Sequence, residues 1–140
     1  MRARKKRRLD MSASELRYLI AANDLAAGGG TVKQTDIANK LGVTKVSAYN
    51  ALERLKEKGY IEKADRKVAL TEKGKEILNE YMTIIDFISA HLALRCGTPR
   101  ERAYDDALNA TCAFSDETRN GVARFIRAGM PGAYREQKIM

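Results

Sequence analysis

The sequence predicts a mainly α-helical fold, and three observations lead to this prediction. Apolar residues make up 44% of the 140-residue chain and recur at helical spacing through most of it. Residues that start helices and glycines that end them lie at the boundaries of these apolar patterns. Only residues 60–70 contain the short apolar segments that are typical of β-strands. We therefore expect several helices and one small hairpin.

The first half of the chain predicts three helices. Ser12 and Glu15 form an S-x-x-E capping box, so the first helix is expected to begin after Ser12 and to stop before three consecutive glycines. Gly42 ends the second helix, because a residue without Cβ permits a sharp turn. Thr44 is expected to cap the third helix. The three helices are expected over residues 13–27, 34–41 and 45–58.

The second half predicts a hairpin and three further helices. The two strands are expected over residues 60–62 and 68–70, with a polar and basic segment between them. A long helix is expected to follow, because apolar residues recur there at i, i+3, i+4 and i+7. The helices are expected from Thr71 to near Gly97, from Pro99 to about Cys112 and from Ser115 to about Ala128.

Three helices followed by a two-stranded ribbon, with a glycine turn before the third helix, are the arrangement of a winged helix-turn-helix. In that arrangement the third helix enters the major groove of DNA, and the formal net charge of +8 favours a polyanionic partner. Asn50 is expected to read a base and Arg54 to contact phosphate. The candidate DNA contacts are Lys45, Ser47, Tyr49, Asn50 and Arg54 on the helix, and Lys63, Arg66 and Lys67 on the hairpin.

Other functional classes lack their sequence signals. The longest apolar run is about five residues, so no membrane segment is expected. No secretory signal follows the basic N-terminus and the two cysteines have no CxxC spacing, so a cytoplasmic protein is expected. Because no glycine-rich phosphate loop, nucleophile elbow or HExxH motif occurs, we expect no enzyme activity.

The segments TDIANKLGVTKVSAYNALERLKEKGYI, LTEKGKEIL and SDE (residues 115–117) resemble the metal-dependent repressor family of the diphtheria toxin repressor and the manganese transport regulator (DtxR/MntR). The resemblance covers residues 12–128 and implies a homodimer formed by the first helix and the helices after the hairpin. It also implies a regulating metal, whose ligand positions align with Arg17, Ile20, Ile85, Ser89, Tyr104, Leu108, Thr111 and Cys112. Only Cys112 is a good ligand for a transition metal, so no metal cofactor is expected.

The predicted organisation is a disordered basic arm over residues 1–11, a winged-helix DNA-binding domain over 12–71, a helical dimerisation domain over 72–128 and a flexible tail over 129–140. The expected function is a transcriptional regulator, acting as a repressor, that binds duplex operator DNA as a homodimer. Two alternatives stay open: a winged-helix regulator of the multiple-antibiotic-resistance type (MarR-like) with a small-molecule effector, and a winged-helix protein-interaction module. An alternative metal or redox site that uses His91, Cys96 or Cys112 also stays open, although the spacing of these residues is only a weak signal for one.

Overall fold

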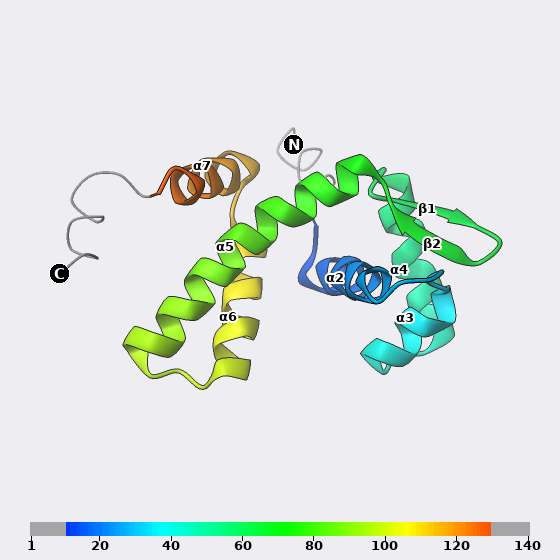
Figure 1. Ribbon diagram of the computed structural model, residues 1–140, viewed down its shortest axis with the longest axis horizontal. Coiled ribbons are helices and arrows are strands. Elements are labelled where there is room, and N and C mark those ends of the chain that lie inside the picture. The colour runs from blue at the N-terminus through cyan, green and yellow to red at the C-terminus, as the bar shows by residue number, and fades with distance from the viewer. Residues whose placement is uncertain (1–10, 130–140) are drawn as a thin grey trace, which may run out of the picture. The chain divides into compact units, whose positions relative to one another are not determined.

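The computed structural model describes residues 11–129 and is mainly helical, with one two-stranded antiparallel sheet in this range (Figure 1). Its elements are α2 (Ala13–Ala27), α3 (Gln34–Leu41), α4 (Lys45–Glu57), β1 (Ile61–Ala64), β2 (Lys67–Leu70), α5 (Glu72–Cys96), α6 (Arg100–Ala113) and α7 (Asp116–Arg127). The prediction of three helices and a hairpin followed by a helical C-terminal region is confirmed.

The chain forms two compact units, and the boundary between them lies inside α5, after Leu78. We call residues 11–78 the N-terminal unit and residues 79–129 the helical unit. Residues 1–10 of the predicted arm and residues 130–140 of the predicted tail lie outside the described residues. Met11, which the prediction included in the arm, is instead a buried residue of the structure, with 2% of its surface exposed.

The helices of the N-terminal unit begin at the capping residues that the sequence indicated. The Ser12 hydroxyl accepts a hydrogen bond from the Glu15 amide at 3.0 Å, and the Ser12 amide donates to Glu15 Oε1 at 3.2 Å. The Thr44 hydroxyl accepts from the Ser47 amide at 3.0 Å, which caps α4. Gly42 has a φ of +68°, so a glycine is favoured at the turn between α3 and α4.

The hairpin strands are longer than predicted, at residues 61–64 and 67–70. The turn contains only Asp65 and Arg66, with φ values of +52° and +68°, and the ladder pairs Ala64 with Lys67. Two-residue turns with positive φ match the twist of a hairpin, so the ladder continues to the turn. The prediction of a longer loop was wrong because Arg66 occupies the position where a glycine usually marks such a turn.

The backbone at the start of α3 holds the hairpin within the N-terminal unit. The Val68 amide donates to the Val32 carbonyl at 2.9 Å, and the Gln34 amide donates to the Arg66 carbonyl at 2.9 Å. An isolated two-stranded hairpin is only marginally stable. These bonds therefore stabilise the hairpin by giving it a neighbouring backbone segment. The core of the unit consists of apolar side chains of α2, α3, α4 and the hairpin, including Leu16, Leu19, Ile37, Leu52, Leu55, Ile61 and Val68.

A buried carboxylate joins α2 to the C-terminal part of α4. The Glu15 side chain is 6% exposed and accepts hydrogen bonds from Lys58 Nζ at 2.7 Å and Arg54 Nε at 2.8 Å. Burial alone would raise the pKa of Glu15, but the hydrogen bonds from Lys58, Arg54 and the Ser12 amide outweigh it and hold this pKa below its ordinary value. The folded state therefore favours the ionised form.

We expect this carboxylate to make the stability of the N-terminal unit depend on pH. Because the folded pKa of Glu15 is depressed, its contribution is complete above the ordinary value of 4.5 and is lost as the pH falls through the folded pKa. At pH 7, Glu15→Gln is expected to lower the free energy of unfolding by about 2 kcal/mol. Urea unfolding of both proteins between pH 7 and pH 3 should show this difference shrinking in acid.

The matched control is Glu72→Gln, which removes a carboxylate that is 88% exposed and 3.6 Å from Lys75. Exposed pairs of this kind contribute little, so this variant should follow the wild type at every pH. A Glu15→Gln deficit that stayed constant down to pH 3 would show that the ionisation of Glu15 does not stabilise the fold.

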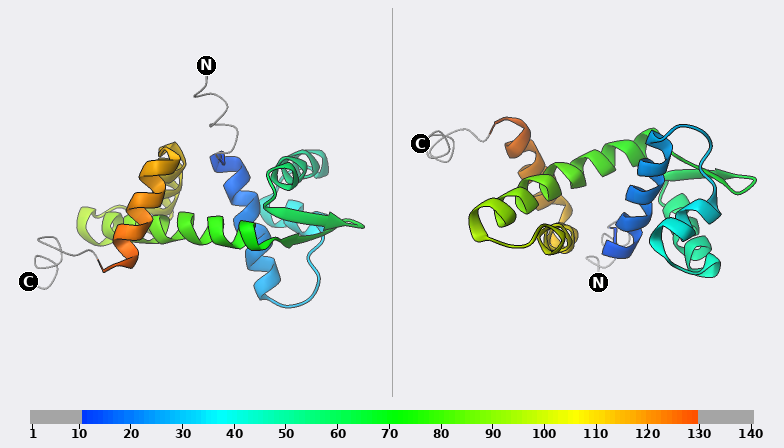
Figure 2. Two further views of the ribbon diagram at one scale, coloured as in Figure 1. Left: turned by 90° about the horizontal axis from the view of Figure 1, so that it is seen from above. Right: turned by 60° about the horizontal axis from the view of Figure 1, so that its bottom comes forward.

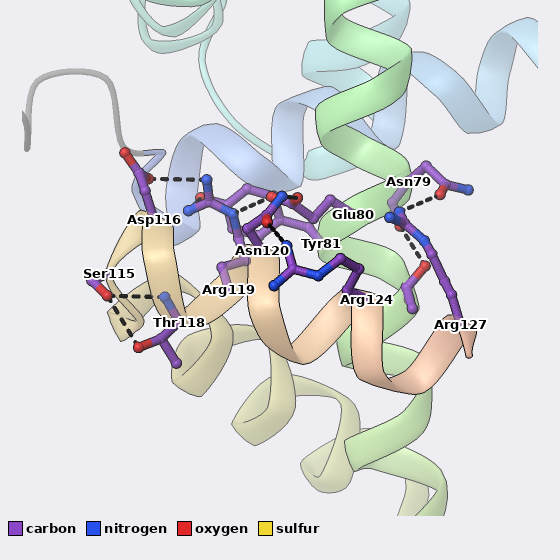
Figure 3. Close-up of polar contacts among 11 residues, drawn as sticks. Asn79, Glu80, Tyr81, Ser115, Asp116, Thr118, Arg119, Asn120, Arg124 and Arg127 are labelled. Atoms are coloured by element: carbon purple, nitrogen blue, oxygen red, sulfur yellow. Dashed lines mark hydrogen bonds and ion pairs between the residues drawn. The ribbon is translucent and has the colours of Figure 1, made fainter. Parts of the chain in front are cut away.

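The helical unit consists of α6, α7 and the part of α5 after Leu78. Figures 1 and 2 show α6 turning back from the end of α5. Buried side chains come from all three helices: Tyr81, Ile84, Ile85, Ala103, Ala107, Leu108 and Ala123. Figure 3 shows α7 joined to α5 by polar contacts, in which Arg119 donates to Glu80 at 2.7 Å and Arg127 donates to Asn79 at 2.7 Å.

Candidate nucleic-acid interface

We call the hairpin formed by β1 and β2 the wing. A cleft of about 650 Å³ lies between α4 and the wing. Its lining contains four basic side chains and two carboxylates, so the cleft has an excess of positive charge. Cations placed between a helix and an adjoining ribbon can bind a polyanionic backbone along two sides. The lining residues are Gln34 and Thr35 of α3, Lys45, Tyr49, Glu53 and Lys56 of α4, and Lys63, Asp65 and Arg66 of the wing.

The N-terminal half of α4 presents a polar side that is open to solvent. The opposite side of the helix is buried through Ala48, Ala51, Leu52 and Leu55, which have at most 1% of their surface exposed. The predicted contact residues of this half are all exposed: Lys45, Ser47, Tyr49 and Asn50. The i, i+3, i+4 pattern of buried alanines and leucines therefore correctly predicted which side of α4 faces outward.

Ser47 and Tyr49 have roles within the fold as well as exposed surface. The Ser47 hydroxyl oxygen accepts a hydrogen bond from the Thr44 hydroxyl at 2.9 Å, next to the cap of α4. The Tyr49 ring is 49% exposed and lies beneath the Lys63 ammonium, which is 4.3 Å from the ring centroid. Both residues therefore have a contact within the fold in addition to their exposed surface.

Lys63 connects the wing to α4. Its side chain is only 10% exposed, and its Nζ donates to Glu53 Oε2 at 2.6 Å while lying over the Tyr49 ring. This hydrogen bond lowers the pKa of Glu53, so the carboxylate stays ionised opposite the cation. The sequence prediction treated Lys63 as an open DNA contact and did not include Glu53, although Glu53 is one helical turn after Tyr49 on the same side.

The other predicted basic residues differ in how freely they can reach a ligand. Arg54 is 51% exposed, but its Nε is bound to Glu15, which leaves the outer nitrogens of the guanidinium for other contacts. Arg66 and Lys67 are exposed at the tip of the wing, where the backbone of both residues is held by the segment before α3. Sequence reasoning missed five residues of the cleft: Gln34, Thr35, Glu53, Lys56 and Asp65.

The positions that align with metal ligands do not fit a divalent cation. Ile85 and Leu108 are aliphatic and fully buried, and the buried Thr111 hydroxyl donates to the Ala107 carbonyl at 2.7 Å. Within residues 11–129, no group of three or more His, Cys, Asp or Glu side chains could hold a metal ion. The donor set expected for a transition metal is therefore not assembled at these positions.

The residues of the alternative metal or redox site do not form a group of metal ligands either. His91 Nδ1 accepts a hydrogen bond from Arg95 Nε at 3.2 Å, and the His91 ring lies 4.4 Å from the Phe87 ring. Cys96 is exposed and Cys112 is half-buried, and neither forms a disulfide in the structure.

None of the helices in residues 11–129 combines the length and apolar character that crossing a bilayer requires.

The helix α4, packed on α2 and α3 and followed by a wing, defines the winged-helix class of fold. The basic cleft gives this fold a surface suited to nucleic acid. The chain belongs to the winged helix-turn-helix family, whose sequence model matches residues 17–89. This membership supports a role in DNA binding and transcription regulation. A search of curated proteins found no match.

Solved structures with a similar fold include the following two. The hypothetical protein SSo2273 from Sulfolobus solfataricus matches with a TM-score of 0.66 and 21% identity, over 86% of this chain and 92% of that chain. IdeR from T. acidophilum matches with a TM-score of 0.60 and 23% identity, over 81% of this chain. The match covers 53% of the IdeR chain, so the present chain spans about half the length of that protein.

Proposed function

We propose that the protein is a DtxR/MntR-like transcriptional repressor that binds duplex operator DNA as a homodimer, without the metal switch of that family. The observation that carries this proposal is the exposed polar side of α4 beside a cleft with four basic residues. The family membership and the similarity of the fold to that of IdeR support it. A protein-interaction module would not require this concentration of cations around α4.

In the proposed complex, the N-terminal half of α4 lies in the major groove and the wing follows the adjoining backbone. The groove is wide enough for one helix, and Asn50 can bond an adenine through two positions of its base edge. Lys45, Lys56 and Arg66 line the cleft, and in this proposal they contact phosphates on both sides of it. Lys63 instead holds the wing against α4 through Glu53, which fixes the width of the cleft.

Asn50→Ala is expected to weaken binding to the preferred duplex by about 1–3 kcal/mol and to leave binding to random duplex nearly unchanged. The reason is that the amide reads a base edge, whereas binding to random sequence depends on the lysines and arginines. Selection from a random DNA pool would supply the preferred site, and titration of both duplexes at several salt concentrations would give the two affinities.

The matched control is Asn39→Ala, which truncates an exposed asparagine on α3 and leaves the outward side of α4 unchanged. This variant should bind both duplexes as the wild type does. Equal losses on preferred and random DNA for Asn50→Ala would contradict base reading by this residue. Absence of salt-dependent binding to any duplex would contradict the proposed function itself.

Divalent metals are expected to leave the operator affinity unchanged within about twofold. The basis is the poor fit of buried Ile85 and Leu108, and of Thr111, to the positions of the metal ligands. The measurement is a DNA titration after treatment with a chelator, repeated with micromolar Mn²⁺, Fe²⁺ or Zn²⁺. Operator binding that became about tenfold tighter with one metal would contradict the proposed absence of a metal switch.

A homodimer would place two α4 helices on two half-sites about one helical turn of DNA apart. The helical unit supports this part of the proposal, because Leu94 is 82% exposed and Phe125 is 45% exposed. Burying such side chains against a second copy is favourable. Sedimentation equilibrium at high micromolar concentration measures the oligomeric state, and a monomer mass there would contradict the dimer.

A further inference from the structure

Apolar surface is concentrated at the start of α4. Among residues 11–129, five large hydrophobic side chains are exposed, and three of them lie at this point: Val43 is 36% exposed, Val46 is 69% exposed and Tyr49 is 49% exposed. Val46 and Tyr49 are three residues apart, so they lie on the same side of the helix. We call Val46 and Tyr49 the apolar strip. It lies on the side of α4 that carries Asn50, which is four residues after Val46.

Val46 contributes little to the fold at this position. The side of α4 that faces the core is filled by Ala48, Ala51, Leu52 and Leu55. A β-branched residue also has a lower helix propensity than alanine or leucine, so local stability does not favour a valine here. An isolated exposed valine needs no explanation, but this valine lies among polar side chains that we propose to face base edges.

We infer that Val46 contacts the C5-methyl group of a thymine in the major groove and makes the protein prefer thymine at that base pair. Thymine is the only standard base that presents a methyl group there, and apolar side chains recognise it by contact. Val46 and Asn50 are separated by about 6 Å along the helix axis, so the two residues would read base pairs close to each other. The inference rests on the proposed insertion of α4 into the groove.

The charge around the strip favours DNA over a protein as the partner. Lys45 precedes Val46 directly, and the cleft that contains Tyr49 also contains Lys56 and Arg66. A protein that covered Val46 and Tyr49 through apolar contact would bury or displace these cations, which is costly unless each is paired. The phosphates on both sides of the major groove pair with them while the methyl groups meet the apolar side chains.

Deoxyuridine substitution in the preferred duplex tests this inference, because it removes only the methyl group and keeps the base pair and its hydrogen-bonding edge. Each thymine is replaced in turn, and the affinity ratio between the thymine and deoxyuridine duplexes is measured. For the wild type, we expect a ratio of about four at one or two positions, which is the value for losing one buried methyl group. For Val46→Ala, we expect a ratio near one at those positions.

Two further variants make the test specific. Val46→Ile keeps an apolar branched side chain and should retain the ratio of the wild type. Leu94→Ala truncates another exposed hydrophobic residue, in the helical unit, and should also retain the ratio even if the overall affinity changes. Val46→Ala should fold normally, because the replaced side chain is 69% exposed and alanine is the better helix former.

The outcomes separate this inference from the proposed function. Salt-dependent binding of the preferred duplex with a ratio near one at every thymine would overturn the thymine contact and leave the repressor proposal standing. A ratio that Val46→Ala retained would assign the methyl contact to another residue and also overturn the inference. If no duplex is bound, the proposed function and the inference both fall, and the strip would instead fit a protein partner.

Discussion

Gly74→Ala is expected to lower the free energy of unfolding of the N-terminal unit by about 3 kcal/mol or more. A Cβ at this position would lie 2.0 Å from the Tyr60 carbonyl oxygen and 2.9 Å from its carbonyl carbon. Both atoms belong to the backbone, so no side-chain rotation can relieve the clash. The first turn of α5 would have to move away from the end of α4 and the start of the wing.

The surrounding hydrogen bonds explain why this movement is costly. The Thr71 amide donates to the Tyr60 carbonyl at 3.0 Å, and the Thr71 hydroxyl donates to the Gly59 carbonyl at 2.6 Å. The same hydroxyl accepts from the Gly74 amide at 2.9 Å. Separating the two segments would break the two bonds to Gly59 and Tyr60 and leave part-buried polar groups without these partners, which adds to the cost of the clash.

Urea unfolding, with circular dichroism as the signal, measures the effect, and Gly28→Ala is the matched control. Gly28 has φ of −76° and ψ of −3°, which alanine adopts readily, and an added Cβ would be 3.5 Å from the nearest atom. The control should stay within about 0.5 kcal/mol of the wild type. A Gly74→Ala protein of wild-type stability would show that the close approach is not maintained in solution.

Arg119→Met is expected to destabilise the helical unit by about 3–5 kcal/mol. The Arg119 side chain is 8% exposed and lies 2.7 Å from Glu80 and 2.9 Å from Asp116 (Figure 3). It also donates to the Tyr81 hydroxyl at 3.1 Å. Burial alone would lower the pKa of Arg119, but the hydrogen bonds to Glu80 and Asp116 and the interaction with Tyr81 raise it, so the side chain stays charged.

Most of this cost comes from the partner that remains. Without Arg119, the Glu80 carboxylate, which is 13% exposed, would lose this ion pair and keep the hydrogen bond that it accepts from Asn120 at 3.0 Å. The double variant Glu80→Gln with Arg119→Met should therefore recover part of the stability, because it removes the uncompensated charge. Hydrogen exchange of the α5, α6 and α7 amides would assign the loss to the helical unit.

Arg127→Met is the matched control for Arg119. Arg127 is an exposed arginine of the same helix, and it donates to Asn79 at 2.7 Å. Its replacement should change the stability by less than about 1 kcal/mol, because exposed polar contacts contribute little. Equal effects of the two arginine variants would show that burial does not strengthen the contacts of Arg119.

The local features of the fold could be predicted because their causes are local. Ser12 and Thr44 cap helices through amides three residues away, and Gly42 permits a turn by its own backbone freedom. The spacing of Ala48 and Ala51 on α4 likewise predicted which side of the helix is buried. The hairpin turn was missed because Arg66 adopts positive φ at the position where a glycine normally indicates such a turn.

By itself, the sequence determined the order of the helices and the wing, the outward side of α4 and the excess of positive charge. These properties follow from side chains within one or two helical turns of each other. Only the tertiary structure decided that Lys63 binds Glu53, that Arg54 binds Glu15 and that Gly74 meets the backbone of Tyr60. A basic residue has the same local pattern whether it faces solvent or a distant carboxylate, so its partner is defined only when the elements pack together.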